Sequence, residues 1–291
     1  MKNHPAYIPF DLFSRFLAVL PKQGIYLFAD ILFFIGYYLV GYRKKVVFDN
    51  LTHAFPEKDK TEIRHIARDF YKHLADVMIE DIAMLHMKPS RLKDFVKVDN
   101  LELLEELYNK GKNITALVGH YGNWELLTTI SLYTPYTILS VYKPLKNKFF
   151  NEKIYQMRKR FDEIPVPMKQ VYQYVVSHQE EGKPFITGLV ADQSPPRKHI
   201  NYWTRFLNQE TAFFTGAEKI ARRFNHAVIF TAVKKIRRGS YQIISQKLVE
   251  DAGQVDEGTI TDQYVKALES LIRKEPRYWL WSHRRWKHKK P

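Results

Sequence analysis

Residues 114–125 read ITALVGHYGNWE, and this stretch indicates the fold. Residues 114–118 are apolar or β-branched, which is typical of a buried strand. The glycines at 119 and 122 suit a tight turn after that strand, and we expect a helix over 123–132. Loops at the carboxyl ends of strands are where α/β folds build their sites, so the turn is the first place to look for chemistry.

Beyond residue 90, predicted β-strands alternate with predicted α-helices along the chain. We predict further strands at 137–141, 185–191, 227–233 and 241–244, with helices at 147–161, 169–181, 215–224 and 261–274. A helix with apolar residues at helical spacing is expected earlier, at 61–86. This alternation predicts an α/β fold, a mostly parallel or mixed sheet flanked by helices. We expect an N-terminal extension over 1–45 and one catalytic domain over 46–291.

The extension contains one long apolar stretch. Residues 24–42 read GIYLFADILFFIGYYLVGY, with a single charge at Asp30. As a helix this stretch would be roughly 28 Å long, close to the ~30 Å hydrocarbon core of a bilayer. The basic residues at 43–45 would leave the main body in the cytoplasm. We expect membrane attachment, either as one span or as an in-plane anchor; a buried helical hairpin in a soluble core is the alternative.

Composition excludes several classes of protein. Without Cys there is no disulfide framework, Cys-ligated metal or thiol nucleophile. The 46 Lys and Arg against 31 Asp and Glu give a net charge of +15, which favours nucleic acid, an anionic membrane or acidic carriers as partners. No RNA- or DNA-binding signature supports nucleic acid. Motifs of nucleotide-binding, serine-hydrolase and zinc-hydrolase sites are absent from the sequence.

His120 and Glu125 are the titratable residues of the glycine-flanked turn. A carboxylate bonded to one ring nitrogen fixes the imidazole tautomer and makes the other nitrogen a better base. Such a base takes the proton of an alcohol as it attacks an ester or thioester. With 11 His and 31 acidic residues, about one H-x4-[DE] match is expected by chance, so the spacing alone carries little weight. A structural histidine in a loop is the alternative.

GHYGNWE at 119–125 resembles the signature of the bacterial late acyltransferases of lipid A biosynthesis, a family related to the glycerolipid acyltransferases. Further blocks, in the same order as in the family, carry the resemblance: RKKVVFDNL with AFPE at 43–57, an Arg-bearing helix at 147–161, ADQ at 191–193, the region 206–216 and WLWSHRRWK at 279–287. Asp162 and Asn208 stand where glycine is common in the family. The resemblance implies a glycerolipid-acyltransferase-like domain.

The resemblance also implies a reaction. An acyl chain would pass from an acyl-carrier-protein thioester to a hydroxyl of a phosphorylated glucosamine lipid, with His120 as the base and Glu125 orienting it. No metal and no cofactor beyond the carrier-bound acyl group are expected, and the place of action would be the cytoplasmic face of the inner membrane. Arg158 or Arg160 would stabilise the oxyanion, and only one of them is expected to face the site, since they lie two apart on a helix. The remaining expected contacts are Asn123, Asp192 and Gln193 to substrate, and Arg284, Arg285 and Trp286 to phosphate or membrane.

Several alternatives stay open on the sequence. Asp192 and Gln193 also suit a helix cap and a turn, and the basic C-terminus also suits a solvated tail. The basic stretch from Lys143 to Arg160 suits an acidic carrier, a lipid phosphate or an exposed helix face. The donor is acyl-carrier protein or coenzyme A, and the acceptor is a lipid A precursor, a lysophospholipid or an amino-acid-containing lipid. A hydrolase with the same residues, or a non-catalytic basic membrane-binding protein, completes the set.

Overall fold

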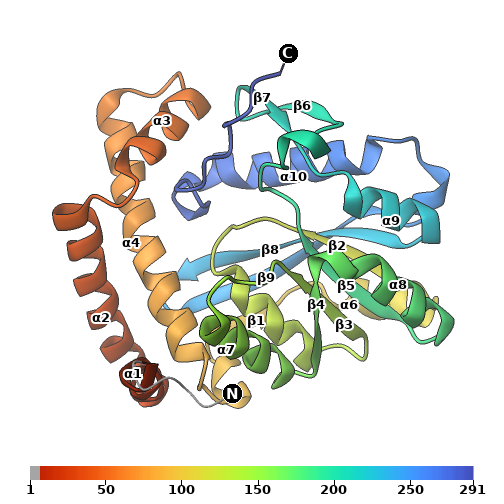
Figure 1. The fold of residues 1–291 in the computed structure, drawn as a ribbon, viewed down its shortest axis with the longest axis horizontal. Helices are drawn as coiled ribbons and strands as arrows, with labels where there is room; N and C mark the ends of the chain where they lie inside the picture. Colours follow the sequence, from red (N-terminus) through yellow and green to blue (C-terminus); the bar gives the residue numbers. More distant parts are fainter. Residues whose placement is uncertain (1–6, 291) are drawn as a thin grey trace.

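β2 (Ile114–Val118) lies at the centre of the main sheet, as its buried sequence pattern predicts. The computed structural model describes residues 7–290. The seven strands of the sheet run in the order β1-β9-β8-β2-β5-β3-β4 (Figure 1). Neighbours pair in parallel apart from β8 and β9, which are antiparallel, so the sheet is mixed and mostly parallel. The other strands are β1 (Val96–Val98), β3 (Thr137–Tyr142), β4 (Glu163–Pro167), β5 (Phe185–Val190), β8 (Ala227–Arg237) and β9 (Ser240–Val249).

The four further strands expected from the sequence are confirmed as β3, β5, β8 and β9, the last two being longer than predicted. The sequence does not predict β1 and β4. β1 has three residues, too few for a pattern, and β4 contains Pro165 and Pro167, which argue against a strand. The prolines are tolerated because β4 lies at the edge of the sheet, where half of its backbone N–H groups need no partner strand.

Helices cover both faces of the sheet (Figure 1). Within β2, Ile114 and Ala116 pack in a core with α6, whereas Leu117 packs in a second core with α9 and α10. This alternation follows from the two-residue period of a strand. The helices of this part are α6 (Leu101–Asn109), α7 (Lys148–Lys159), α8 (Val171–Glu180), α9 (Gly216–Phe224) and α10 (Thr259–Lys274), and the 3-10 segments are η3 (Trp124–Leu132), η4 (Met168–Gln170), η5 (Arg197–His199), η6 (Ala252–Gln254) and η7 (Pro276–Tyr278).

The N-terminal helices form a layer along one side of the sheet (Figure 1). The predicted long helix is α4 (Lys60–Met84), which begins at a capping box made by Asp59 and Glu62. Leu17, Ile25 and Ala29 of the preceding helices are buried in the same core as the sheet, so these helices pack against the body. The division expected at residue 45 stays a prediction. The other helices are α1 (Ile8–Val19), α2 (Lys22–Phe34), a π-helical continuation η2 (Ile35–Val40), α3 (Lys44–Ala54) and the short α5 (Pro89–Leu92).

The apolar stretch expected near the N-terminus is a continuous helix over Lys22–Val40, long and apolar enough to cross a membrane by length and composition. Only 17% of this stretch is buried in the protein. Its Asp30 is not isolated, because Arg238, in the turn between β8 and β9, pairs with it at 2.7 Å. A helix that is mostly exposed yet ion-paired to the body is attached along one side and open on the other.

The two positions that depart from the resembling family are both compatible with their turns. Asn208 and Leu207 connect β6 (Trp203–Phe206) to β7 (Gln209–Ala212), with φ values of 63° and 49°. Two positive φ angles make a type I′ hairpin turn, in which Asn is favoured. The Asn208 side chain also donates to the carbonyl of Ala54 at 3.0 Å. Asp162, with φ 55°, occupies the same left-handed region that glycine would.

Candidate active site

The turn after β2 is shaped by its glycines. Gly122 has φ 63°, and a Cβ there would lie 1.9 Å from the backbone oxygen of Val233, so only glycine fits. The turn is also tied to the C-terminal segment, because Gly122 N donates to Tyr278 O at 2.9 Å and Leu280 N donates to His120 O at 3.1 Å. The helix expected next is a 3-10 helix, η3. Two hydrogen bonds to residues 278–280, one on each side of Tyr121, therefore hold the backbone around His120.

Asp192 supplies the carboxylate on His120. Its Oδ1 accepts from His120 Nδ1 at 2.6 Å, and its Oδ2 accepts from the His120 backbone N–H and from Trp279 Nε1, each at 2.8 Å. Burial raises the pKa of Asp192, but the charge and hydrogen bonds of His120, with Trp279, lower it further, to about 2. Burial lowers the pKa of His120, and the attraction of Asp192 more than offsets this, so the net shift is upward.

The strand register explains this pairing. β2 and β5 are parallel neighbours, and Val118 stands opposite Val190. Two residues further along each chain, His120 and Asp192 leave the sheet side by side. Burial of Asp192 to 2% exposure fixes the carboxylate against the imidazole. The sequence predicts that Asp192 contacts substrate, whereas the structure places it on the His120 imidazole, at a position that arises from sheet topology.

The second ring nitrogen of His120 is left as an acceptor. Because Nδ1 donates to a carboxylate, Nε2 carries a lone pair. The side-chain amide of Gln193 donates to that nitrogen at 3.1 Å, and the Trp124 ring packs edge-on against the imidazole at 4.9 Å. The His120 side chain keeps 14% of its surface exposed. This arrangement provides a base at Nε2 with a weak partner that an alcohol can replace.

Glu125 has a different partner from the one expected. Its Oε2 accepts from Arg158 Nη2 at 3.1 Å, whereas the carboxylate on His120 is Asp192. The predicted orientation of His120 by Glu125 is therefore corrected. Glu125 lies in the first turn of η3, where α7 presents Arg158 to it. Glu125 still contributes a favourable charge that raises the pKa of His120.

Of the two candidate arginines, Arg158 is the one beside the motif. Arg160 donates from Nη2 to the carbonyl of Met84 at 2.7 Å and so points to the C-terminal end of α4. Arg158 lies between Glu125 and Glu163, and its Nη1 is buried without a hydrogen-bond partner among residues 7–290. Burial raises the pKa of Glu163 to about 7, even though Arg158 opposes the shift. Arg158 thus has a free donor next to the loop of His120.

Asn123 lies behind the turn. It is 0% exposed, and its Nδ2 donates to Glu80 Oε2 at 2.8 Å. Glu80 also accepts from the hydroxyls of Tyr26 at 2.5 Å and Tyr241 at 2.8 Å. The structure therefore places Asn123 as an anchor of the loop on α4, rather than in the substrate contact expected from the sequence.

The expected C-terminal contacts separate into two environments. Arg284 is exposed, but Arg285 is 2% exposed, with its guanidinium carbon 4.3 Å above the centroid of Phe213. Trp286 donates to Thr211 Oγ1 at 2.8 Å and stacks on Phe206. A membrane-surface contact by Arg285 is therefore wrong, and Trp286 mainly packs against the β6–β7 hairpin. The pattern of alternating aromatic and basic residues does not distinguish a buried segment from a surface one.

Glu80, Asp81 and Trp279 belong to the surroundings of the site, and the sequence does not predict them there. Trp279 holds Asp192. Asp81 is half-buried, with its Oδ1 atom out of contact with solvent, and the burial of its carboxylate and the charge of Glu125 raise its pKa. A signal for Asp81 exists, since it continues the apolar spacing of Phe70, Leu74 and Val77 on α4. A carboxylate on the buried face of a helix marks a polar interior. No group of three or more metal-binding side chains occurs within residues 7–290, and metal independence stays a prediction.

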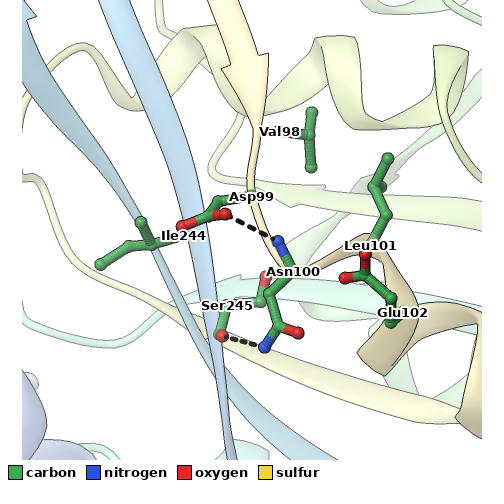
Figure 2. Close-up of a pocket in the computed structure, with 7 residues that line it drawn as sticks. All are labelled: Val98, Asp99, Asn100, Leu101, Glu102, Ile244 and Ser245. Atoms are coloured by element: carbon green, nitrogen blue, oxygen red, sulfur yellow. Dashed lines mark hydrogen bonds between the residues drawn. The ribbon is translucent and has the colours of Figure 1, made fainter.

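A separate surface pocket lies at the carboxyl end of β1. In Figure 2, the Asp99 carboxylate accepts from the Asn100 backbone N–H at 3.1 Å, and Asn100 Nδ2 donates to the Ser245 carbonyl at 3.3 Å. β1 runs antiparallel to β2. The carboxyl end of β1 therefore lies at the opposite end of the strands from the turn of His120, which follows the carboxyl end of β2. The pocket is lined by Val98, Asp99, Asn100, Leu101, Glu102, Ile244 and Ser245, none of which belongs to the His120 site.

Comparison with known proteins identifies the family. The family model described as bacterial lipid A biosynthesis acyltransferase matches residues 2–288. The lipid A biosynthesis palmitoleoyltransferase of Escherichia coli (strain K12) and the lipid A biosynthesis acyltransferase of Shigella flexneri are each 21% identical over 247 residues, 84% of this chain and 79% of theirs. A crystal structure of the 1-acyl-sn-glycerophosphate acyltransferase PlsC from Thermotoga maritima aligns over 89% of this chain and 98% of its own, at 12% identity and a TM-score of 0.39. The chain belongs to the bacterial lipid A biosynthesis acyltransferase family.

Proposed function

We propose that His120 is the general base of an O-acyl transfer from an acyl-carrier-protein thioester to a hydroxyl of a lipid A precursor. Membership of the family makes the chain an acyltransferase of lipid A biosynthesis, and the proposal adds the donor and the mechanism. The observation that carries it is the 2.6 Å bond from His120 Nδ1 to Asp192, which leaves a lone pair on Nε2. A histidine held in this way is the form that accepts a proton from an attacking hydroxyl.

The bonds change in two steps. The acceptor oxygen attacks the thioester carbonyl carbon while Nε2 of His120 takes the hydroxyl proton, and a tetrahedral oxyanion forms. The C–S bond then breaks, the ester forms, and the imidazolium returns its proton to the departing thiolate. Asp192 stabilises the imidazolium between the two steps, because its carboxylate stays ionised in the buried pair. Direct transfer suits a chain without cysteine.

Arg158 is proposed as the donor to the oxyanion. Its Nη2 is held by Glu125, and its Nη1 has no partner among the residues that the structure describes. A guanidinium fixed on one side by a carboxylate costs little reorganisation when charge develops on the other side. Glu125 then acts through Arg158. In the H-x4-E motif the glutamate positions this arginine and does not contact the imidazole. Gln193 gives up its bond to Nε2 when the acceptor hydroxyl arrives.

The choice of an acidic carrier rests on charge. Lys143, Lys146 and Lys148 are exposed in the segment that joins β3 to α7 and continues into that helix, and the chain carries +15 overall. Acyl-carrier proteins are acidic, so a positive surface would steer them toward the protein. The segment precedes α7, the helix that carries Arg158. Coenzyme A is the competing donor, and a comparison of the two thioesters decides between them.

We also propose that the protein attaches to the cytoplasmic face of the inner membrane through the outer sides of α1, α2 and its continuation η2. A span by Lys22–Val40 would take Asp30 and its partner Arg238, which belongs to the main body, into hydrocarbon. In-plane attachment leaves this pair intact. The exposed apolar side chains on the outer sides are Ile8, Leu12, Phe16, Val19, Leu27, Ile31, Phe34, Ile35, Leu39 and Val40. Such a surface inserts into the headgroup region of a bilayer.

Mass spectrometry of reaction products tests the function. Detergent-purified protein is given acyl-carrier protein or coenzyme A thioesters, each with a lipid A precursor or a lysophospholipid. The expected result is one added acyl group on the precursor, with the carrier-protein donor, and its loss in His120→Ala. His53→Ala, at an exposed histidine of α3, is the matched control and should transfer normally. Transfer to the lysophospholipid alone would overturn the acceptor, and an active His120→Ala would overturn the mechanism.

A further inference from the structure

Trp279 connects the Asp192–His120 pair to the C-terminal segment. Asp192 accepts three hydrogen bonds, and two of them, from Nδ1 and from the backbone N–H, come from His120 itself. These two bonds hold the carboxylate to the imidazole but would allow both groups to move together. The third comes from Trp279, whose Nε1 donates to Oδ2 at 2.8 Å from a position 87 residues further along the chain. The Trp279 bond therefore relates the pair to another part of the protein.

The Trp279 indole has little freedom to turn. The residue is 2% exposed. Three rings meet it edge-on, with centroid distances of 4.8 Å for Trp281, 5.7 Å for Phe206 and 6.0 Å for Trp286. A buried ring enclosed by others keeps one rotamer, and its N–H then points in one direction. Aromatic packing thus sets the position of the donor to Asp192.

The backbone of residues 278–283 is hydrogen-bonded to two other parts of the chain. Toward the site, two backbone hydrogen bonds join it to residues 120–122. On the other side, Asn50 of α3 is buried and donates from Nδ2 to the carbonyls of Trp281 at 2.8 Å and His283 at 2.9 Å. The first and the last of the motif blocks in the sequence therefore meet here. A segment bonded on both sides is a firm support for the ring that it carries.

We propose that Trp279 is a positioning residue for acyl transfer: its indole N–H holds Oδ2 of Asp192, and with it the His120 base, where the acceptor hydroxyl arrives. The inference rests on the proposed role of His120 as the base. Without this donor, the carboxylate and the imidazole could shift together, and Nε2 would no longer point in one direction. A displacement of reacting groups by about 1 Å can cost about 100-fold in rate.

The same bond bears on the proton that His120 accepts. An N–H presents the positive end of its dipole to the carboxylate and so makes the pair less negative toward an imidazolium. Loss of this N–H should therefore favour protonation of His120. The other charged and titratable groups that act on the pair stay in place when residue 279 is changed; they are Glu125 of η3 with its partner Arg158 of α7, Tyr264 of α10, and His283 and Arg285 of the C-terminal segment.

Two substitutions remove the N–H in different ways. Trp279→Phe removes it together with part of the ring, whereas benzothienylalanine at position 279 keeps the two-ring shape and replaces the N–H with sulfur. Trp286→Phe is the matched control, because it loses the same ring volume and also an Nε1 hydrogen bond of 2.8 Å, which is made to Thr211 and not to Asp192. Trp286 and Trp279 belong to one aromatic cluster, so the control reproduces the packing defect.

The experiment measures kcat, KM and the pH–rate profile of acyl transfer, with thermal melting, for the full-length wild type, these three variants and His120→Ala. Both variants at position 279 should lose kcat by about 10-fold or more at an unchanged KM. Their acid limb of kcat should move to higher pH by on the order of half a unit. The benzothienylalanine variant should melt near the wild-type temperature, whereas Trp286→Phe should melt lower and yet keep the wild-type kcat and acid limb.

The outcomes separate the role of Trp279 from the proposed function. If both variants at position 279 react like Trp286→Phe while His120→Ala is inactive, the role of Trp279 is overturned and the proposed function stands. If the benzothienylalanine variant reacts like the wild type while Trp279→Phe is impaired, ring volume matters and the N–H does not, which also overturns it. A wild type that transfers no acyl group, or an active His120→Ala, overturns the proposed function itself, and the role of Trp279 with it.

Discussion

Asp192→Asn tests the arrangement of the base most directly. The asparagine side chain has the same shape, and its oxygen can still accept from Trp279 and from the His120 backbone, which now meet Oδ2 at 2.8 Å. Its amide nitrogen would then face Nδ1, where Oδ1 lies at 2.6 Å. An amide donor at that place requires Nδ1 to be an acceptor and moves the ring proton to Nε2. The base would then carry a proton where it must receive one.

The size of the effect follows from the tautomer. In serine proteases, the same exchange of aspartate for asparagine lowers kcat by about 10⁴-fold, so we expect a loss of about 10³- to 10⁴-fold here, or roughly 4–5.5 kcal/mol in the barrier. The fold should survive. A carboxylate whose pKa falls from 3.8 to about 2 on folding contributes about 2 kcal/mol of stability, present above the unfolded-state pKa and lost as the pH falls toward about 2. Asp192→Asn loses that contribution at pH 7 but keeps two of the three hydrogen bonds.

The assay is single-turnover acyl transfer at saturating donor, followed by mass spectrometry, with thermal melting of the same samples. Asp256→Asn, at an exposed residue ahead of α10, is the matched control and should react at the wild-type rate. A folded Asp192→Asn that retains more than about a tenth of kcat would refute the assignment of Asp192 as the carboxylate that sets the tautomer.

Three further predictions concern the neighbouring parts of the molecule. Glu125→Gln should leave the His120 tautomer intact but loosen Arg158, lowering kcat about 10- to 100-fold. Its pH–rate profile should show an acid limb moved to lower pH, because the charge of Glu125 raises the pKa of His120; a loss as large as that of Asp192→Asn would contradict this order. Gly122→Ala should cost about 3 kcal/mol or more by chemical denaturation, because a Cβ there would lie 1.9 Å from a backbone oxygen; wild-type stability would show that the turn is not rigid. Leu39→Asp, in η2, should lower binding to anionic vesicles about tenfold without changing transfer in detergent. Met168→Asp, distant in the chain and also exposed, should bind normally, and equal binding of the two variants would argue against a membrane-binding surface on α1, α2 and η2.

The sequence predicts the sheet well because its strands are buried on both faces and separated by amphipathic helices. It predicts β2 and β5 within a residue of their ends, and their parallel pairing follows from the alternation. It misses the short edge strands β1 and β4, since three residues carry no periodicity and prolines hide a strand. Local patterns thus predict the centre of the fold better than its edges.

For the candidate site, the sequence predicts which residues take part better than it predicts which of them are hydrogen-bonded to one another. It indicates His120, Asp192 and Gln193, but the H-x4-E spacing points to a partner of the imidazole five residues away, and the partner lies 72 residues away. The missing quantity is the register that sets Val118 opposite Val190, which no pattern along one strand reveals. For Arg285, the composition of its segment indicates a surface, whereas packing on Phe213 places it inside.

Glu80 connects the turn of His120 to the N-terminal helix α2 through hydrogen bonds. This carboxylate of α4 accepts from Tyr26 of α2, from Tyr241 of β9 and from Asn123 of the turn that carries His120. Three donors from three elements would lose their acceptor together if it were removed, so the bonds constrain one another. Because Asp30 of the same α2 pairs with Arg238, the helix is held at two points along its length. Under the proposed attachment through the outer side of α2, these contacts fix the height of His120 above the membrane, as the proposed transfer to a hydroxyl of a lipid at the bilayer surface requires.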